Sequence, residues 1–144
     1  AGYFEYVVPP LEGLWWTDDP GFDGKPPADK NDFRWTSLIR QPDFVTEDIF
    51  GWALERLAKK KPELDLSKAR FLRWEEGLCA HLLHIGPSDE EPASIDKLDT
   101  FTEKEGYSVD FSETRRHHEI YLGDPRRTAP EKLKTVIRHP VKKA

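Results

Sequence analysis

The segment "HHEIYLGD", which begins at His117, places a carboxylate inside a stretch whose neighbours favour a β-strand. Side chains alternate between the two faces of a strand, so His117, Glu119 and Tyr121 are predicted to share one face. The other face receives the apolar residues Ile120 and Leu122, which a core requires. If helices cover that apolar face, Glu119 lies on the open face with Tyr121, in a position to bind a ligand.

The ordinary alternative for Glu119 is a solvated side chain beside Arg115 or Arg116, because most glutamates in proteins are exposed. The tryptophans favour a pocket instead. Five occur in 144 residues, and alternation places Trp15 and Trp16 on opposite faces of a predicted strand. Some indole rings must therefore lie away from the helix-covered face, in an interface or a ligand pocket. A carboxylate among such rings attracts flat cationic guests, with cation–π attraction of about 0.5–2 kcal/mol per ring.

Other reactive side chains lack matching partners. His117, His118 and Glu119 are metal-type ligands, but neighbours on a strand diverge and no third ligand has a matched spacing. His81 and His84 fall on opposite strand faces. The serines occur in no nucleophile-elbow context, and the sequence holds no phosphate loop or dinucleotide fingerprint. We therefore expect neither a metal nor a cofactor.

The composition is that of one globular domain. A chain of 144 residues with 37% apolar and 12% aromatic residues can bury a core of its own. No apolar run approaches the roughly 18 residues that suggest a membrane span, and the N-terminus lacks a signal-peptide pattern. The net charge of −5 argues against a nucleic-acid-binding module. Cys79 is the single cysteine, which excludes an internal disulfide and fits a reducing cytoplasm.

The predicted elements mix strands and helices, which is typical of an α+β fold. Strands at 11–17 and 33–40 are expected to form a hairpin across a long loop rich in Gly, Pro and Asp. The remaining elements are, in order, a helix at 46–61, two strands meeting near Gly77, a helix at 92–106, two strands between 107 and 122, and a helix at 128–139.

Four long segments resemble the stand-alone GyrI-like small-molecule-binding proteins: "PLEGLWWTDD", "FRWTSLIRQPDFVT", "EEGLCAHLLHIGPSDEEP" and "HHEIYLGDPRRTAPEKLKTVIRHPV". The resemblance runs from about Leu11 to Val141. It implies two strand-helix-strand-strand modules with an antiparallel sheet and a ligand cleft between them. Residues 1–144 would then be a single domain, with 1–77 the remainder of the first module and a linking helix, and 78–144 the second module and a C-terminal helix. The first module is incomplete on this pattern, since a strand and a helix should precede it.

The resemblance also implies that aromatic walls around an acidic residue bind flat, hydrophobic and often cationic molecules, as in multidrug or toxin recognition. Glu119 matches the buried cleft glutamate of the family. The assembly is expected to be a monomer or a homodimer. The expected cleft residues are Trp16, Trp35, Trp74, Glu119, Tyr121 and His117.

One branch of the family is hydrolytic and adds water to the strained cyclopropane of DNA-alkylating compounds. The resemblance gives Glu119 and Tyr121 the catalytic roles of positioning or deprotonating water and holding the substrate. Desolvation raises the pKa of a carboxyl group and makes it a better base. This chain has Ser88 where the hydrolytic branch has a tyrosine, so Tyr121 or Tyr107 would have to replace it. A third class, a module that binds another protein, is compatible with the exposed arginines and acidic loops.

Overall fold

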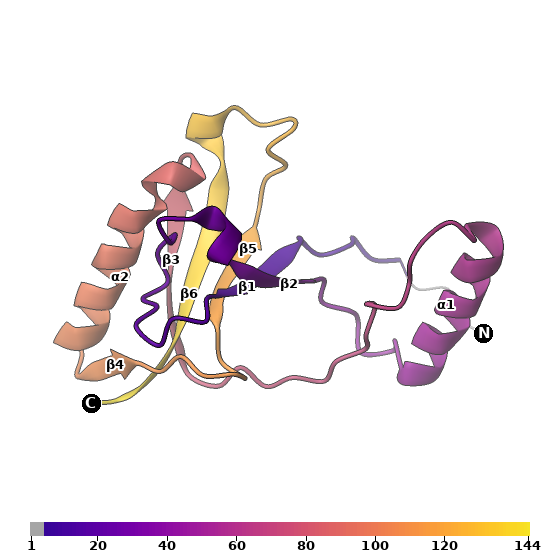
Figure 1. Ribbon diagram of the computed structural model, residues 1–144, viewed down its shortest axis with the longest axis horizontal. Coiled ribbons are helices and arrows are strands. Elements are labelled where there is room, and N and C mark those ends of the chain that lie inside the picture. Colours follow the sequence, from indigo (N-terminus) through magenta and orange to yellow (C-terminus); the bar gives the residue numbers. More distant parts are fainter. Residues whose placement is uncertain (1–4) are drawn as a thin grey trace. The chain divides into compact units, whose positions relative to one another are not determined.

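The computed structural model describes residues 5–144, which fall into two compact units (Figure 1). The first unit combines the chain up to Ile39 with residues 76–144, and the second comprises Arg40–Glu75. Within the described residues, the first unit holds the six strands and helix α2, whereas the second holds helix α1. No helix of the described residues is long and apolar enough to cross a membrane.

The first unit is built on an antiparallel sheet in which distant parts of the sequence lie side by side (Figure 1). The strands are β1 (Glu12–Trp16), β2 (Arg34–Leu38), β3 (Cys79–Ile85), β4 (Tyr107–Val109), β5 (His117–Tyr121) and β6 (Lys134–Lys143). Their order is β2-β1-β5-β6-β3, and β4 pairs with β6 outside this path. Strand β5 is therefore central, with Glu119 paired to Gly13 on one side and to Ile137 on the other.

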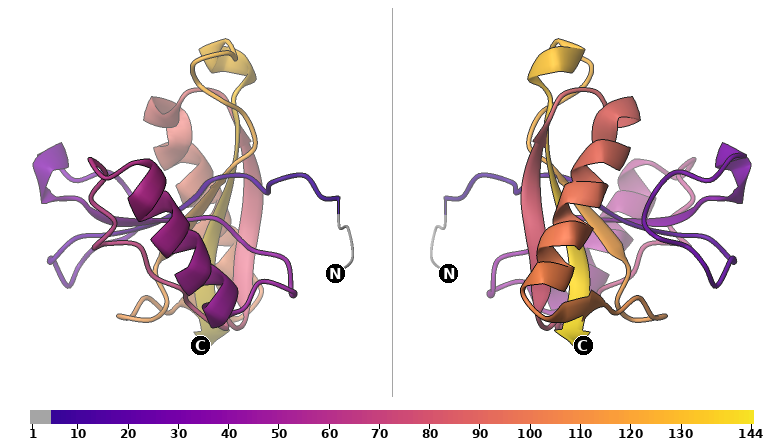
Figure 2. Two further views of the ribbon diagram at one scale, coloured as in Figure 1. Left: turned by 90° about the vertical axis from the view of Figure 1, so that its right-hand side faces the viewer. Right: turned by 90° about the vertical axis from the view of Figure 1, so that its left-hand side faces the viewer.

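Helix α2 (Glu91–Lys104) covers one face of this sheet (Figure 2). Ile95 and Leu98 are three residues apart and lie on the same side of the helix. They pack on Ile137 of β6, which is 0% exposed, and on the partly buried Leu82 of β3. Burying one such side chain contributes about 1.5–3 kcal/mol to stability. This small cluster is the apolar core beneath α2.

The second unit contains helix α1 (Glu47–Lys60). The hydroxyl of Thr46 caps its first turn by accepting a hydrogen bond from the backbone N–H of Ile49 at 3.3 Å. The ring of Phe50 lies 5.9 Å from that of Phe71, centroid to centroid, and packs the helix against the segment that follows it. The helix predicted at 46–61 is confirmed.

The predicted α+β fold with an antiparallel sheet is confirmed, as are the hairpin of β1 and β2 and the helix near 92–106. The helix predicted at 128–139 is wrong. Only Pro130–Lys132 form a 3-10 turn, and strand β6 takes up residues 134–143. Thr135, Ile137 and His139 are buried at a period of two, a strand signal that the capping-box pattern of the preceding residues outweighed.

The predicted strand before Gly77 is also absent, because β3 begins at Cys79 and residues 69–77 form no strand or helix. The division of residues 1–144 into modules at residue 77 stays a prediction.

Replacing Ile137 by alanine removes the side chain at the centre of the core. We expect a loss of about 2–5 kcal/mol in the free energy of unfolding, measured by urea unfolding with tryptophan fluorescence. Ile85→Ala, on an edge strand with 58% of the residue exposed, should cost less than about 1 kcal/mol. Equal losses in the two variants would contradict a core centred on Ile137.

Candidate functional site

Glu119 lies in the middle of β5 and is only 9% exposed, so the solvated alternative is wrong. Residues directly opposite each other on paired strands share a face of the sheet. Glu119 is opposite Ile137 and therefore lies on the face that α2 covers. The prediction that helices cover the face of Ile120 and Leu122 is wrong for this unit, and Leu122 is 49% exposed. The helix-covered face accepts polar groups because they hydrogen-bond to one another.

Both carboxylate oxygens of Glu119 are engaged. The Tyr121 hydroxyl donates to Oε2 at 2.7 Å, and Nε2 of His117 lies 2.9 Å from Oε1. The indole Nε1–H of Trp15 donates to the Tyr121 oxygen at 2.8 Å. Burying a carboxylate without such partners costs several kcal/mol. The three side chains thus hold Glu119 in one position and satisfy it there.

The hydrogen bonds continue beyond His117 to the surface. Nδ1 of His117 lies 2.8 Å from Nε2 of His139 on β6, and Nδ1 of His139 lies 2.8 Å from Oδ1 of Asp99 on α2. Both imidazoles are buried, whereas the Asp99 side chain is 29% exposed. Burial lowers the pKa of His139, although the hydrogen bond to Asp99 acts in the opposite direction. A continuous chain of polar side chains therefore joins Glu119 to the surface of α2.

A second carboxyl group, that of Glu91 at the start of α2, adjoins Glu119 and is also buried. Burial, the negative charge of Glu119 and a hydrogen bond with it all raise the pKa of Glu91. Burial also acts to raise the pKa of Glu119, but hydrogen bonds from His117 and Tyr121 outweigh it and lower that pKa. The two carboxyl groups titrate as a pair. Near neutral pH, Glu91 holds a proton and Glu119 carries the negative charge.

Burial and the charge of Glu119 also raise the pKa of the Tyr121 phenol, which therefore stays protonated. A protonated phenol and a protonated carboxyl group thus flank one carboxylate. This set of groups can accept a cation, orient a water molecule or donate a proton to a bound ligand.

Aromatic rings extend the site over β1 and β2. Trp15 and Trp35 are paired across the hairpin with their rings stacked at 5.9 Å between centroids, and the Phe33 ring meets Trp15 edge-on at 5.1 Å. Trp35 is 61% exposed and presents its ring to solvent. A Cβ on Gly13 would lie 2.7 Å from Nε1 of Trp15 and 2.9 Å from the Tyr121 hydroxyl. Glycine at this position therefore leaves room for the Trp15–Tyr121 hydrogen bond.

The loop between β1 and β2 lies against α2 and over the two histidines. Lys25 in this loop forms an ion pair with Asp96 of α2 at 2.6 Å. Gly24 has a φ of 91°, and a Cβ there would lie 2.7 Å from Nε2 of His139 and 2.9 Å from Nδ1 of His117. The close approach of this backbone helps to shield the imidazoles from water.

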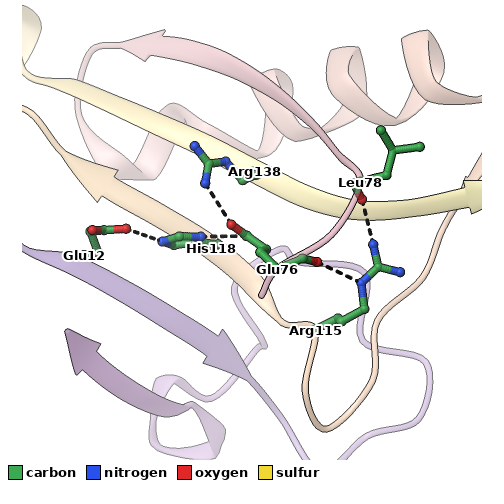
Figure 3. Close-up of polar contacts among 6 residues, drawn as sticks. All are labelled: Glu12, Glu76, Leu78, Arg115, His118 and Arg138. Atoms are coloured by element: carbon green, nitrogen blue, oxygen red, sulfur yellow. Dashed lines mark hydrogen bonds and ion pairs between the residues drawn. The ribbon is translucent and has the colours of Figure 1, made fainter. Parts of the chain in front are cut away.

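On the opposite face, a second network fixes β5 (Figure 3). His118 lies between two carboxylates, with Nε2 2.7 Å from Oε1 of Glu12 and Nδ1 2.7 Å from Oε1 of Glu76. Arg138 donates to the other oxygen of Glu76 at 2.8 Å. Burial acts to raise the pKa of Glu76, but these partners outweigh it and lower that pKa. Arg115 completes the network by donating to the backbone oxygen of Glu76 at 3.2 Å.

The structure brings together several of the residues predicted for the site. His117, Glu119 and Tyr121 are in direct contact, and Trp35 joins them through Trp15. The sequence prediction missed Trp15, Glu91, His139 and Asp99 as members of the site. Alternation alone did not identify Trp15, because the register that pairs it with His117 links segments more than 100 residues apart.

One predicted site residue, Trp16, is not brought to Glu119. Trp16 lies on the opposite face of the sheet, where its ring is 4.6 Å from the guanidinium of Arg116. Trp74 belongs to the second compact unit and remains a prediction as a ligand contact. The histidines and carboxylates of the site bond to one another, and within residues 5–144 no group of three or more is arranged to hold a metal ion.

Surface hollows lie at the start of α2 beside β3 and within the loop between β1 and β2, and neither includes Glu119 in its wall. The stacked Trp15–Trp35 pair is partly exposed, and Tyr121 links Trp15 to the carboxylate of Glu119.

Comparisons with known proteins agree with this architecture. A family model described as a GyrI-like small-molecule-binding domain matches residues 4–142. An uncharacterized conserved protein from Listeria innocua has a similar structure, with a TM-score of 0.90, 46% identity, and coverage of 98% of this chain and 67% of that chain. Two structures described as hydrolases from Listeria innocua have TM-scores of 0.84 and identities of 45% and 46%. They cover 98% of this chain, and the matches span 66% and 67% of theirs.

This chain therefore spans about two thirds of the length of those structures. A search of curated proteins gave no match.

The raised pKa of Glu91 predicts a pH dependence of stability. The folded protein holds this proton to higher pH than the unfolded chain does. The resulting stability is complete below the ordinary pKa of glutamate and is lost as the pH rises toward the raised value. In Glu91→Gln the amide resembles the protonated carboxyl group but has no proton to lose as the pH rises. In urea unfolding, the unmodified protein should lose at least about 1 kcal/mol more than this variant between roughly pH 5 and pH 8.

The matched control is Glu90→Gln, because Glu90 is the exposed neighbour. That substitution should leave the pH dependence unchanged. The same dependence in Glu91→Gln and the unmodified protein would show that Glu91 is ionised in the folded state.

Proposed function

This chain belongs to the GyrI-like small-molecule-binding family, and we propose that it binds flat, hydrophobic, often cationic aromatic molecules with Glu119 as the polar anchor. The observation that carries this proposal is the buried, hydrogen-bonded carboxyl group of Glu119, whose pKa its partners lower, beside a partly exposed aromatic surface. We further propose that the protein acts in the cytoplasm, in the recognition of drugs or toxins.

The aromatic surface suits a planar guest. The rings of Trp15 and Trp35 lie at an interplanar angle of 29°, so together they offer a nearly flat surface, and Trp35 has one exposed side. Aromatic rings prefer offset stacking, and a cation above an indole gains about 0.5–2 kcal/mol. The surface therefore selects flat rings over branched apolar molecules.

The anchor suits a positive charge. Glu119 stays ionised because His117 and Tyr121 lower its pKa, and Glu91 is neutral beside it. Coulomb attraction is stronger at a buried site than in water, since the effective dielectric constant is lower. A guest that stacks on Trp35 and carries its charge toward Tyr121 would use both features.

N-Methylphenanthridinium and phenanthridine test the anchor, because they share one planar ring system and differ in a permanent positive charge. Glu119→Gln should weaken binding of the cation about tenfold, equivalent to about 1.4 kcal/mol, and leave binding of the neutral ring unchanged. Fluorescence titration at neutral pH measures both affinities. Unchanged affinity for the cation would remove Glu119 as the anchor.

The aromatic surface has its own test with the same two compounds. Trp35→Ala should weaken both by about tenfold, because stacking does not depend on the charge of the ring. Trp52→Ala is the matched control, since Trp52 is similarly exposed, at 59%, on helix α1. Equal effects of the two substitutions would argue against a specific surface at Trp35.

A second candidate function is hydrolysis of strained electrophiles such as cyclopropane-containing DNA-alkylating compounds. It is supported by the contact between Glu119 and Tyr121 and by the similarity, at 45% and 46% identity, to structures described as hydrolases. Of the two tyrosines proposed to replace the one missing at Ser88, Tyr121 contacts Glu119, whereas Tyr107 lies on β4.

In this reaction Glu119 would orient water and take up its proton, although its lowered pKa makes it a weaker base than desolvation alone would give. The water oxygen would bond to a ring carbon as the strained carbon–carbon bond breaks. The released electron pair would move to the conjugated oxygen of the substrate, which would take a proton from Glu91 or Tyr121. Both of these groups are protonated and adjoin Glu119.

Incubation with a cyclopropane-bearing alkylating compound tests this candidate. Mass spectrometry should detect the product with one added water forming faster than in buffer. Glu119→Gln should slow the reaction by at least about a hundredfold, as expected for the loss of a general base. A rate equal to that in buffer would exclude the hydrolase function for this chain.

A further inference from the structure

We propose that the side-chain series Asp99–His139–His117 stores one labile proton beside Glu119 and releases it to water at Asp99 when a cationic ligand binds. The inference rests on the proposed binding function and adds an exchange of ligand for proton to it. Its basis is a count of the protons that the hydrogen bonds of the series require.

The series contains three hydrogen bonds, each of which needs one proton. They join Asp99 to His139 at 2.8 Å, His139 to His117 at 2.8 Å, and His117 to Glu119 at 2.9 Å. Two neutral imidazoles supply two protons, and two carboxylates supply none. One additional proton must therefore be present for all three bonds to form.

Burial makes this additional proton necessary. His117 and His139 are 2% and 0% exposed, so water cannot easily replace a missing partner. An unpaired buried polar atom is costly, and among the described residues no buried side-chain nitrogen or oxygen lacks a partner. The series thus favours the state in which every bond is made.

The contacts point to His117 as the carrier of the additional proton, since it lies between the carboxylate of Glu119 and a ring nitrogen of His139. Burial lowers the pKa of His139, whereas His117 directly faces the carboxylate of Glu119. An imidazolium at His117 donates from both ring nitrogens, to His139 and to Glu119. The ionisable groups near His139 are Asp99 on α2 and Asp23 in the loop between β1 and β2, and those beside Glu119 are Tyr121 on β5 and Glu91 on α2. Lys25 of the same loop pairs with Asp96 of α2 and with Asp23.

A cation that reaches Glu119 repels the imidazolium and favours loss of its additional charge. The proton on Nδ1 of His139 can pass to Asp99 and then to water. The Nδ1 proton of His117 moves to Nε2 of His139 in its place, and both imidazoles end neutral. One cation enters and one proton leaves, while the Nε2–H of His117 still donates to Glu119.

This exchange breaks a hydrogen bond only where water can replace it. The lost bond is that between His139 and Asp99, whose side chain is 29% exposed. The bond between the two imidazoles persists with His139 as the donor instead of His117. The bond from His117 to Glu119 is unchanged. The backbone of Gly24 remains over the imidazoles and helps to shield them from water.

Isothermal titration calorimetry with N-methylphenanthridinium tests the exchange. Titrations at one near-neutral pH in phosphate and in Tris, which differ in ionisation enthalpy, give the number of protons released. We expect about one proton per cation, and an affinity that rises up to about tenfold per pH unit. Phenanthridine should release none, because it brings no positive charge.

Two variants identify the source of the proton. In Asp99→Asn the amide can donate to Nδ1 of His139, so two neutral imidazoles satisfy the series and proton release should fall toward zero. Glu91→Gln removes the other proton beside Glu119 and should leave the release intact. A merely structural role of Asp99 would change affinity for both ring compounds and leave the proton count unchanged.

The outcomes separate this inference from the function on which it rests. Cation binding without proton release, or release that persists undiminished in Asp99→Asn, would overturn the inference and leave the binding function standing. Failure of the protein to bind either ring compound would overturn both.

Discussion

A carboxylate removed from water must be surrounded by hydrogen-bond donors, and Glu119 imposes this requirement at the centre of the sheet. His117 and Tyr121 meet it from the same strand, because residues two apart share a face. Gly13 on the neighbouring strand provides the space in which Trp15 completes the arrangement. Burial of the Glu119 carboxylate therefore explains why hydrogen-bond donors occupy positions 117 and 121 and why a glycine lies opposite it.

The same strand is buried and polar on both faces. His118 is held between Glu12 and Glu76 on one face, and His117 lies between Glu119 and His139 on the other. Apolar packing under α2 is a small cluster by comparison. Hydrogen bonds therefore specify how β1, β5 and β6 align, while the apolar cluster holds the helix. Such networks favour a single arrangement, because a shift of register would leave buried groups unpaired.

Local patterns in the sequence predicted the strand at Glu119, the shared face of His117 and Tyr121, and the α+β class. They did not predict the features that depend on pairing between strands distant in sequence. The register that opposes Gly13 to Glu119 joins segments distant in sequence. His139 was assigned to a predicted helix that the structure does not contain. A capping-box pattern at the start of that segment was given more weight than the alternation of residues along β6. The face covered by α2 was mispredicted, because polar side chains lie on it where apolar ones are usual. They are tolerated there since they hydrogen-bond to one another.

The ionised state of Glu119 is the claim on which both the anchor and the proton exchange depend. Carbon-13 NMR of protein labelled at the glutamate carboxyl carbon measures it directly, with the Glu119 resonance assigned by its loss in Glu119→Gln. The account predicts a carboxylate chemical shift at neutral pH and a titration below the ordinary range of glutamate. A Glu119 resonance at the position of a protonated acid at neutral pH would contradict it.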